Sequence, residues 1–95
     1  MATVGYARVS SLDQDYDGQI EKLKAAGCDR VLSEKVSGKS RNGRHALQKA
    51  LQALSPGDTL VVVRLDRLAR STLDLLNILD QVAKANAGFK SLSET

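Results

Sequence analysis

The chain has 95 residues, enough for one small domain with a modest hydrophobic core. Its apolar share of 42% is typical of a globular chain and excludes a disordered one, while an aromatic share of 3% argues against the stacking surfaces of single-strand binders. The formal net charge of +3 is modest, so only its distribution along the chain can point to a partner.

The sequence also disfavours a membrane protein and a disulfide-bonded protein. No apolar run is long enough to span a bilayer, and the first residues lack the basic and then apolar order of a secretory signal, so we expect a cytoplasmic protein without a membrane partner. The single cysteine, Cys28, excludes an internal disulfide and is expected to be a small core residue. The single histidine, His45, is expected to be solvated at a helix start, and we expect no bound metal.

Strand and helix patterns alternate along the chain. Residues 2–9 predict a strand, residues 13–27 an amphipathic helix and residues 31–33 a short strand. Gly18 disfavours the helical state by about 1 kcal/mol relative to alanine, so the first helix is expected to begin late or to be loose. A second helix runs through Leu47 to Leu54 and is stopped by residues 55–57.

The second half of the chain continues the same alternation. The unbroken run of residues 60–63 predicts a fully buried strand. A capping box at residues 71–74 opens a helix that is expected to end at Gly88, and residues 89–92 form the last strand. This βαβαβαβ order predicts a three-layer α/β/α sandwich with a mainly parallel central sheet.

Ser10 is the first candidate for chemistry because it stands where the first strand ends. Side chains alternate along a strand, so Tyr6, Arg8 and Ser10 are expected to lie on the same face. A phenol, a guanidinium and a hydroxyl suit phosphate chemistry. Taken alone, Ser10 would more commonly cap the following helix. It is the presence of Tyr6 and Arg8 on the same face that favours Ser10 as a nucleophile.

Basic residues gather in two segments of the chain. No acid lies between Glu34 and Asp58, and a second basic run at residues 64–71 follows the buried strand. This asymmetry favours an anionic polymer as partner, although charge runs of this kind are commonly a solvated face. Arg67 and Arg70 could likewise form only surface pairs with Asp66.

These motifs together resemble the catalytic domain of the serine recombinases of the resolvase/invertase type. The specific parts are the Tyr-x-Arg-x-Ser run at residues 6–10 and the Asp-Arg-Leu-x-Arg run at residues 66–70, whereas the Ser-Gly pair at 37–38 and the Gly-Asp pair at 57–58 are commonplace. The resemblance covers all 95 residues and implies a resolvase-like fold.

The resemblance also implies a reaction. Ser10 would attack a phosphodiester of double-stranded DNA, leaving a 5′-phosphoserine link and a free 3′-hydroxyl, with no cofactor because the link conserves the bond energy. Arginines would stabilise the charge on the transferred phosphate. The implied catalytic residues are Ser10, Arg8, Arg67, Arg70, Tyr6, Gln19, Ser37, Arg44 and Asp66, and Lys39, Arg41 and Arg64 are expected to contact DNA.

The chain departs from the family pattern in three respects, one of which is Gly18 within the first predicted helix. Family members continue into a long dimerisation helix and a helix-turn-helix domain, so residues 1–95 are expected to be the N-terminal part of the catalytic domain and inactive alone, with the full-length protein a homodimer or homotetramer. Glu34 stands where the family commonly has an acid, often aspartate, and its longer side chain is expected to change how the end of the second strand meets the site. The sequence does not choose among resolution, inversion, integration and transposition.

Two other classes of function remain open from the sequence. A non-catalytic DNA-binding or regulatory module could use the same basic cleft, and a covalent adduct with DNA would distinguish it from an enzyme. A flavodoxin-like domain for a phosphorylated metabolite ranks third, because the chain lacks a glycine-rich phosphate loop of either standard spacing.

Overall fold

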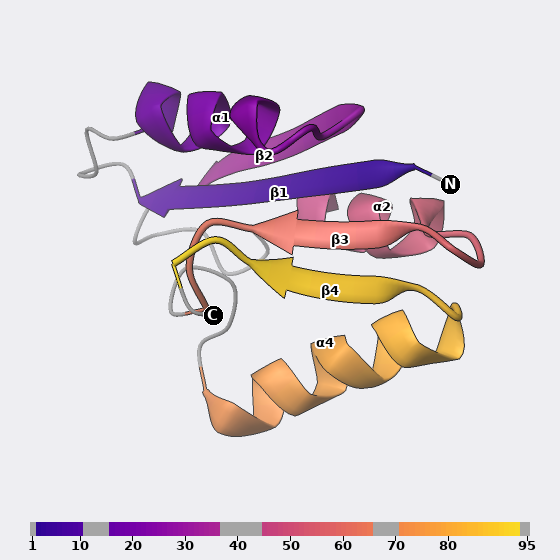
Figure 1. Ribbon diagram of the computed structural model, residues 1–95. Helices are drawn as coiled ribbons and strands as arrows, with labels where there is room; N and C mark the ends of the chain where they lie inside the picture. Colours follow the sequence, from indigo (N-terminus) through magenta and orange to yellow (C-terminus); the bar gives the residue numbers. More distant parts are fainter. Residues whose placement is uncertain (1, 11–15, 37–44, 66–70, 94–95) are drawn as a thin grey trace.

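The computed structural model describes residues 2–10, 16–36, 45–65 and 71–93 (Figure 1). Four strands alternate with three helices in these ranges, as the sequence predicted. The strands are β1 (Thr3–Ser10), β2 (Arg30–Val36), β3 (Thr59–Val62) and β4 (Gly88–Ser91), and the helices are α1 (Tyr16–Ala25), α2 (His45–Ala53) and α4 (Thr72–Lys84).

The strands form one parallel sheet in the order β2-β1-β3-β4. Figure 1 shows α1 on one face of this sheet and α2 and α4 on the other, so the predicted three-layer parallel α/β architecture is confirmed. The alternation of side chains divides the core accordingly. Val4 and Tyr6 pack with α2 and α4, whereas Ala7 packs with α1.

The central strand β3 is covered on both faces, as its unbroken apolar run predicted. Leu60 and Val62 belong to the core on the α2 and α4 side, and Val61 belongs to the core under α1. All three are at most 2% exposed. The predicted last strand is β4, which lies at the edge of the sheet.

Strand β2 is longer than the sequence predicted. A strand at residues 31–33 is confirmed, but its predicted length is wrong. The structure has a seven-residue strand that pairs with β1 from Val4 opposite Arg30 to Ser10 opposite Val36. Ser33 and Glu34 are polar, which is typical of a loop. Pairing with a central strand overrides that local preference.

Helix ends also differ from the prediction. Helix α4 ends at Lys84 and not at Gly88, because Asn86 adopts the left-handed conformation with φ 56° and Gly88 begins β4. At the start of α4 the predicted cap is present, since the N–H of Asp74 donates to Oγ of Ser71 at 3.1 Å. Helix α1 ends before Gly27, which has φ 91°.

Asp58 joins three segments at the amino edge of the sheet. Its carboxylate accepts the backbone N–H groups of Ala2 and Ser55, each at 2.8 Å, and its carbonyl oxygen accepts the N–H of Gly88 at 2.8 Å. The two bonds to the carboxylate lower the pKa of Asp58. The hydrogen bonds of Asp58 therefore connect the segments at this edge of the sheet. The candidate site lies at the opposite edge.

Candidate active site

The carboxyl ends of all four strands lie at one edge of the sheet, because every pair is parallel (Figure 1). Strand β1 lies between β2 and β3, and the chain leaves β1 toward β2 but later returns to β3 on its other side. Ligands in open parallel sheets bind in the crevice outside such a reversal of strand order. Ser10, the last residue of β1, has its backbone at this edge.

Tyr6 and Glu34 connect the two strands on the α2 face. The side chain of Tyr6 is 1% exposed, and its hydroxyl donates a hydrogen bond to Oε2 of Glu34 at 2.5 Å. Arg8 is the next residue of β1 on the same face, and its Cα is the register partner of Glu34. The structure therefore brings together Tyr6 and Arg8, as predicted, and adds a carboxylate beside them.

Glu34 also accepts hydrogen bonds at the start of α2. Its Oε1 accepts the backbone N–H of Ala46 at 3.3 Å, and its Oε2 accepts that of Leu47 at 3.4 Å. The first N–H groups of a helix have no partner within the helix, and a side chain just before it commonly supplies the acceptor. The residue before α2 is Arg44, whose guanidinium has only donors.

The sequence singled out Glu34 as a position where the family commonly has an acid, but Glu34 was not among the predicted site residues. The structure places Glu34 near the predicted site because β2 runs parallel to β1 and ends at the same edge of the sheet.

Gln19 lies on the opposite side of the sheet from Tyr6. It precedes Leu23 by one turn of α1, and Leu23 packs in the core between α1 and the sheet. The Gln19 side chain is 3% exposed, and within the described part of the chain its Oε1 has no hydrogen-bond partner. The structure therefore does not place Gln19 with Tyr6, and no donor among the described residues reaches its buried acceptor.

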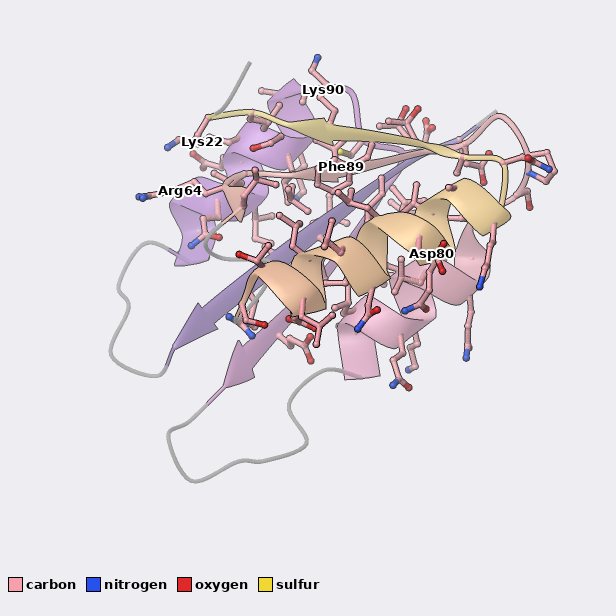
Figure 2. The ribbon with its side chains drawn as sticks, turned by 90° about the horizontal axis from the view of Figure 1, so that it is seen from below. Lys22, Arg64, Asp80, Phe89 and Lys90 are labelled. Carbon is pink, nitrogen blue, oxygen red and sulfur yellow. The ribbon has the colours of Figure 1, made fainter. Side chains whose placement is uncertain are left out.

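Arg64 follows β3 and is exposed, and Figure 2 shows its side chain extending outward. It adds a cation after the strand that neighbours β1 at the carboxyl edge. The other predicted site residues lie outside the described residues, as does the side chain of Ser10. They are Ser37, Lys39, Arg41, Arg44, Asp66, Arg67 and Arg70.

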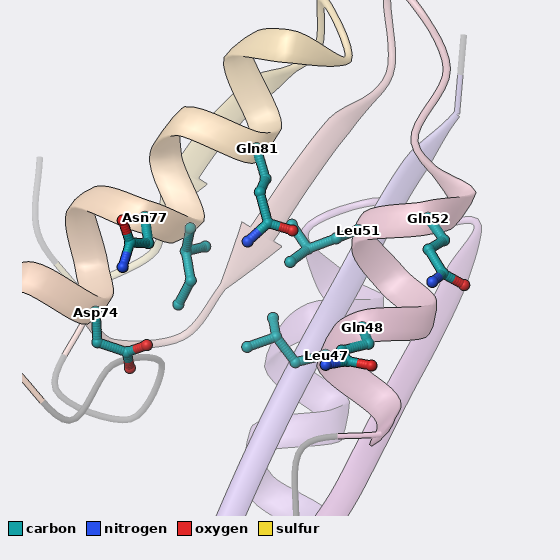
Figure 3. A pocket seen from close by; sticks show the side chains of 8 residues that line it. Leu47, Gln48, Leu51, Gln52, Asp74, Asn77 and Gln81 are labelled. Atoms are coloured by element: carbon teal, nitrogen blue, oxygen red, sulfur yellow. The ribbon is translucent and has the colours of Figure 1, made fainter.

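A cavity of about 330 Å³ lies between α2 and α4 (Figure 3). None of the predicted site residues lines it. Its lining combines apolar side chains with amides and one acid, namely Leu47, Gln48, Leu51, Gln52, Asp74, Asn77, Ile78 and Gln81. Among the described residues, no group of three or more histidine, cysteine, aspartate or glutamate side chains could hold a metal ion. The described helices are too short or too polar to cross a membrane.

Comparison with known families matches residues 3–95 to the family described as "Resolvase, N terminal domain". The chain belongs to this resolvase family. The resemblance drawn from the Tyr-x-Arg-x-Ser and Asp-Arg-Leu-x-Arg runs is thereby confirmed.

Relatives of the resolvase domain carry the names of recombinases. The chain is 50% identical over 91 residues to a probable DNA-invertase of Sinorhizobium fredii, covering 96% of the chain and 30% of that protein. It is 44% identical over 95 residues to a DNA-invertase of Salmonella typhimurium, covering 100% of the chain and 50% of the invertase. It is 41% identical over 92 residues to a serine recombinase of Escherichia phage Mu, covering 97% of the chain and 47% of that recombinase. The chain thus spans half or less of each relative.

A solved structure has the same fold as this resolvase domain. The crystal structure of the first ORF in transposon ISC1904 from Sulfolobus solfataricus P2 matches with a TM-score of 0.77, covering 97% of this chain and 67% of that chain. The two sequences are 22% identical, so this likeness shows the fold alone.

Proposed function

We propose that this chain is the N-terminal catalytic part of a site-specific DNA recombinase that uses Ser10 as its nucleophile. The observation that carries the proposal is the position of Ser10 at the end of β1, where the strand order reverses and where Tyr6 and Arg8 precede it on the same strand. The family membership and the recombinase names of the relatives support the same reading.

The proposed step is a transfer of the phosphodiester from DNA to the serine. The bond between Ser10 Oγ and phosphorus forms while the bond from phosphorus to the 3′-oxygen breaks. The serine proton leaves and the 3′-oxygen gains a proton, so the products are a 5′-phosphoserine link and a 3′-hydroxyl. Because the link conserves the bond energy, the reverse step can rejoin exchanged strands without a cofactor.

The arginines would stabilise the transition state. Guanidinium groups bind phosphate oxygens in bidentate fashion, which suits Arg8, Arg67 and Arg70 to the transferred phosphate, with Arg44 in support. Tyr6, Ser37 and Asp66 would shape the site, and Gln19 would contribute from the α1 side of the sheet. Lys39, Arg41 and Arg64 would attract the DNA backbone. None of the described residues donates a hydrogen bond to the buried Oε1 of Gln19, which supports a polar role for that side chain because a buried acceptor without a donor is unfavourable.

The proposed substrate is double-stranded DNA, and the proposed active form is a homodimer or homotetramer of the longer protein. The names of the relatives divide between invertase and resolvase, so they do not fix the outcome of recombination. We therefore propose the shared step of cleavage and rejoining.

The test needs a full-length recombinase. The 95 residues align with 50% of the Salmonella typhimurium DNA-invertase, so they can replace its aligned residues in a chimera. The chimera should form a covalent adduct with DNA that survives denaturation, and Ser10→Ala should abolish the adduct while DNA binding persists.

Ser11→Ala is the matched control and should retain the adduct. An adduct formed by the Ser10→Ala chimera would show that the nucleophile is misassigned. A chimera that binds DNA but forms no adduct with Ser10 present would favour the non-catalytic DNA-binding module.

A further inference from the structure

The cavity between α2 and α4 combines apolar walls with a polar rim. Leu47 of α2 and Ile78 of α4 are buried, Leu51 is half-buried, and together they supply the apolar part of the lining. Exposed carboxamides form the rim, namely those of Gln48, Gln52, Asn77 and Gln81. With a volume of about 330 Å³, the cavity lies at the lower end of the range of small-ligand sites, roughly 300 to 1,000 Å³. It therefore has room for one small ligand.

The charge of this lining is negative. Asp74, in the first turn of α4, is half-buried and lines the cavity, and within the described part of the chain no lysine, arginine or histidine lines it. Figure 3 shows Asp74 and Gln81 extending from α4, and Leu47 and Leu51 from α2, toward the space between the helices. A carboxylate beside apolar walls attracts an opposite charge more strongly than one in water does. The cavity therefore favours a cation, whereas the basic segments of the chain favour an anion.

The polar groups of the lining also favour a particular kind of cation. Each carboxamide oxygen and both carboxylate oxygens accept hydrogen bonds. A guanidinium carries five donors in one plane and is more weakly hydrated than an ammonium, so it suits acceptors that stand around apolar side chains. A short alkyl stem attached to it would lie against Leu47, Leu51 and Ile78, away from water.

We propose that the cavity between α2 and α4 binds an alkylguanidinium cation, with the guanidinium at Asp74 and the alkyl stem on the apolar lining. Two sources share this chemistry, a free small molecule and the arginine side chain of a protein partner. The proposal goes beyond the proposed recombinase function and does not rest on it, because none of the predicted site residues lines the cavity. Binding is therefore measured on the 95-residue chain.

Titration with butylguanidinium, followed by the amide chemical shifts in NMR spectra, tests the proposal. The amide signals of Leu47, Asp74 and Gln81 should shift with a dissociation constant on the order of a millimolar, while those of Lys22 on α1 and Lys90 on β4 should not. The neutral amide pentanamide should bind about tenfold more weakly or worse, and butylammonium should also bind more weakly. No shift with butylguanidinium, or equal binding of either control molecule, would overturn the proposal.

The carboxylate of Asp74 is tested by substitution. Asp74→Asn should weaken the binding of butylguanidinium about tenfold or more, because a charge-assisted hydrogen bond is lost. Asp80→Asn is the matched control, since Asp80 is exposed on the same helix and is not part of the lining. It should bind butylguanidinium as the wild type does. Equal weakening by both variants would contradict binding at Asp74.

A second pair of variants predicts a gain of affinity, which a loosened fold would not produce. Gln48→Glu adds a carboxylate to the lining, so it should tighten the binding of butylguanidinium about threefold or more. Lys49→Gln is the matched control, because it changes the net charge by the same amount at the next residue of α2, outside the lining. It should have little effect. Equal tightening by both variants would mean that only the overall charge attracts the cation, and would overturn the proposal.

A capped peptide distinguishes the two sources of the guanidinium. Tighter binding of acetyl-alanyl-arginyl-alanine amide than of butylguanidinium would support the arginine side chain of a protein partner. Weaker binding of the peptide would support a free small molecule. Failure of both probes to shift the amide signals of the lining would overturn the proposal. Failure of the proposed recombinase function is a separate outcome, since it appears as an adduct that persists in the Ser10→Ala chimera.

Discussion

Asp58 and Ala2 are joined at the amino edge of the sheet by a hydrogen bond of 2.8 Å from the Ala2 N–H to Oδ1 of Asp58. The other carboxylate oxygen accepts the N–H of Ser55. Both bonds favour the ionised carboxylate, which is why they lower its pKa in the folded chain. The start of β1 therefore depends on a charged group at the amino edge of the sheet. The candidate site lies at the opposite, carboxyl edge.

The lowered pKa of Asp58 predicts a pH-dependent contribution to stability. A carboxylate with a depressed folded pKa stabilises the fold above its unfolded pKa of about 3.9, and this contribution is lost as the pH falls through the folded pKa. The difference in free energy of unfolding between wild type and Asp58→Asn should thus be largest near pH 7 and should shrink below about pH 4.

Urea unfolding from pH 7 to pH 3 measures this difference. Asp80→Asn is the control, since Asp80 is exposed and forms an ion pair with Lys84, one helix turn away, at 3.0 Å. It should change stability little at any pH. A difference for Asp58→Asn that does not vary with pH would contradict the role of its charge.

Gly5 predicts a steric effect under α1. A Cβ at this position would lie 2.9 Å from Sγ of Cys28 and 3.3 Å from Cβ of Leu23, so Gly5→Ala should destabilise the fold by about 1–3 kcal/mol. Adding Cys28→Ala removes the closest atom. The double variant should therefore show a favourable coupling of about 0.5 kcal/mol or more.

Chemical denaturation of the four chains of this double-mutant cycle measures the coupling. Gly88→Ala is the matched control, because a Cβ there would meet Thr59 Oγ1 at an ordinary 3.5 Å. Additive effects of the Gly5 and Cys28 substitutions would show that the thiol does not limit the space. Burial and the neighbouring Asp29 raise the pKa of the Cys28 thiol, consistent with its predicted place in the core.

The sequence was sufficient for the architecture because its strongest patterns are local. The apolar run of residues 60–63 specified a central strand, and Ser71 specified the start of α4. The length of β2 and the contacts of Glu34 could not be predicted in this way, because both depend on partners that are distant in the sequence. Strand β2 pairs with β1. Glu34 forms hydrogen bonds with Tyr6, 28 residues away, and with Ala46, 12 residues away. Local polarity indicated a loop, and tertiary pairing produced a strand.

The proposed function predicts weak DNA binding by the 95-residue chain alone. Its expected contacts are with phosphates, which release counterions, so the affinity should fall steeply with salt and vary little with DNA sequence. Fluorescence anisotropy measures both properties when the chain is titrated into each of two unrelated duplexes at salt concentrations from about 50 to about 200 mM. Strong preference for one duplex would contradict this expectation.

The last prediction separates the basic residues by role in the invertase chimera. Arg67 and Arg70 are proposed to bind the transferred phosphate, so Lys at either position keeps the charge but removes the bidentate fork. Loss of one well-aimed donor at a transition state raises the barrier by about 3 to 4 kcal/mol, so the cleavage rate should fall by about a hundredfold or more. Gln at Lys39 or Arg41 should instead weaken DNA binding modestly and reduce its salt dependence.

Single-turnover cleavage at saturating DNA distinguishes the two pairs, because a defect in binding alone disappears at saturation. The variants at Lys39 and Arg41 should then cleave at nearly the rate of the unsubstituted chimera, while those at Arg67 and Arg70 should remain slow. Equal rate losses for both pairs would mean that the arginines form a general basic surface. In that case the DNA-binding module would explain the basic segments better than a catalytic site does.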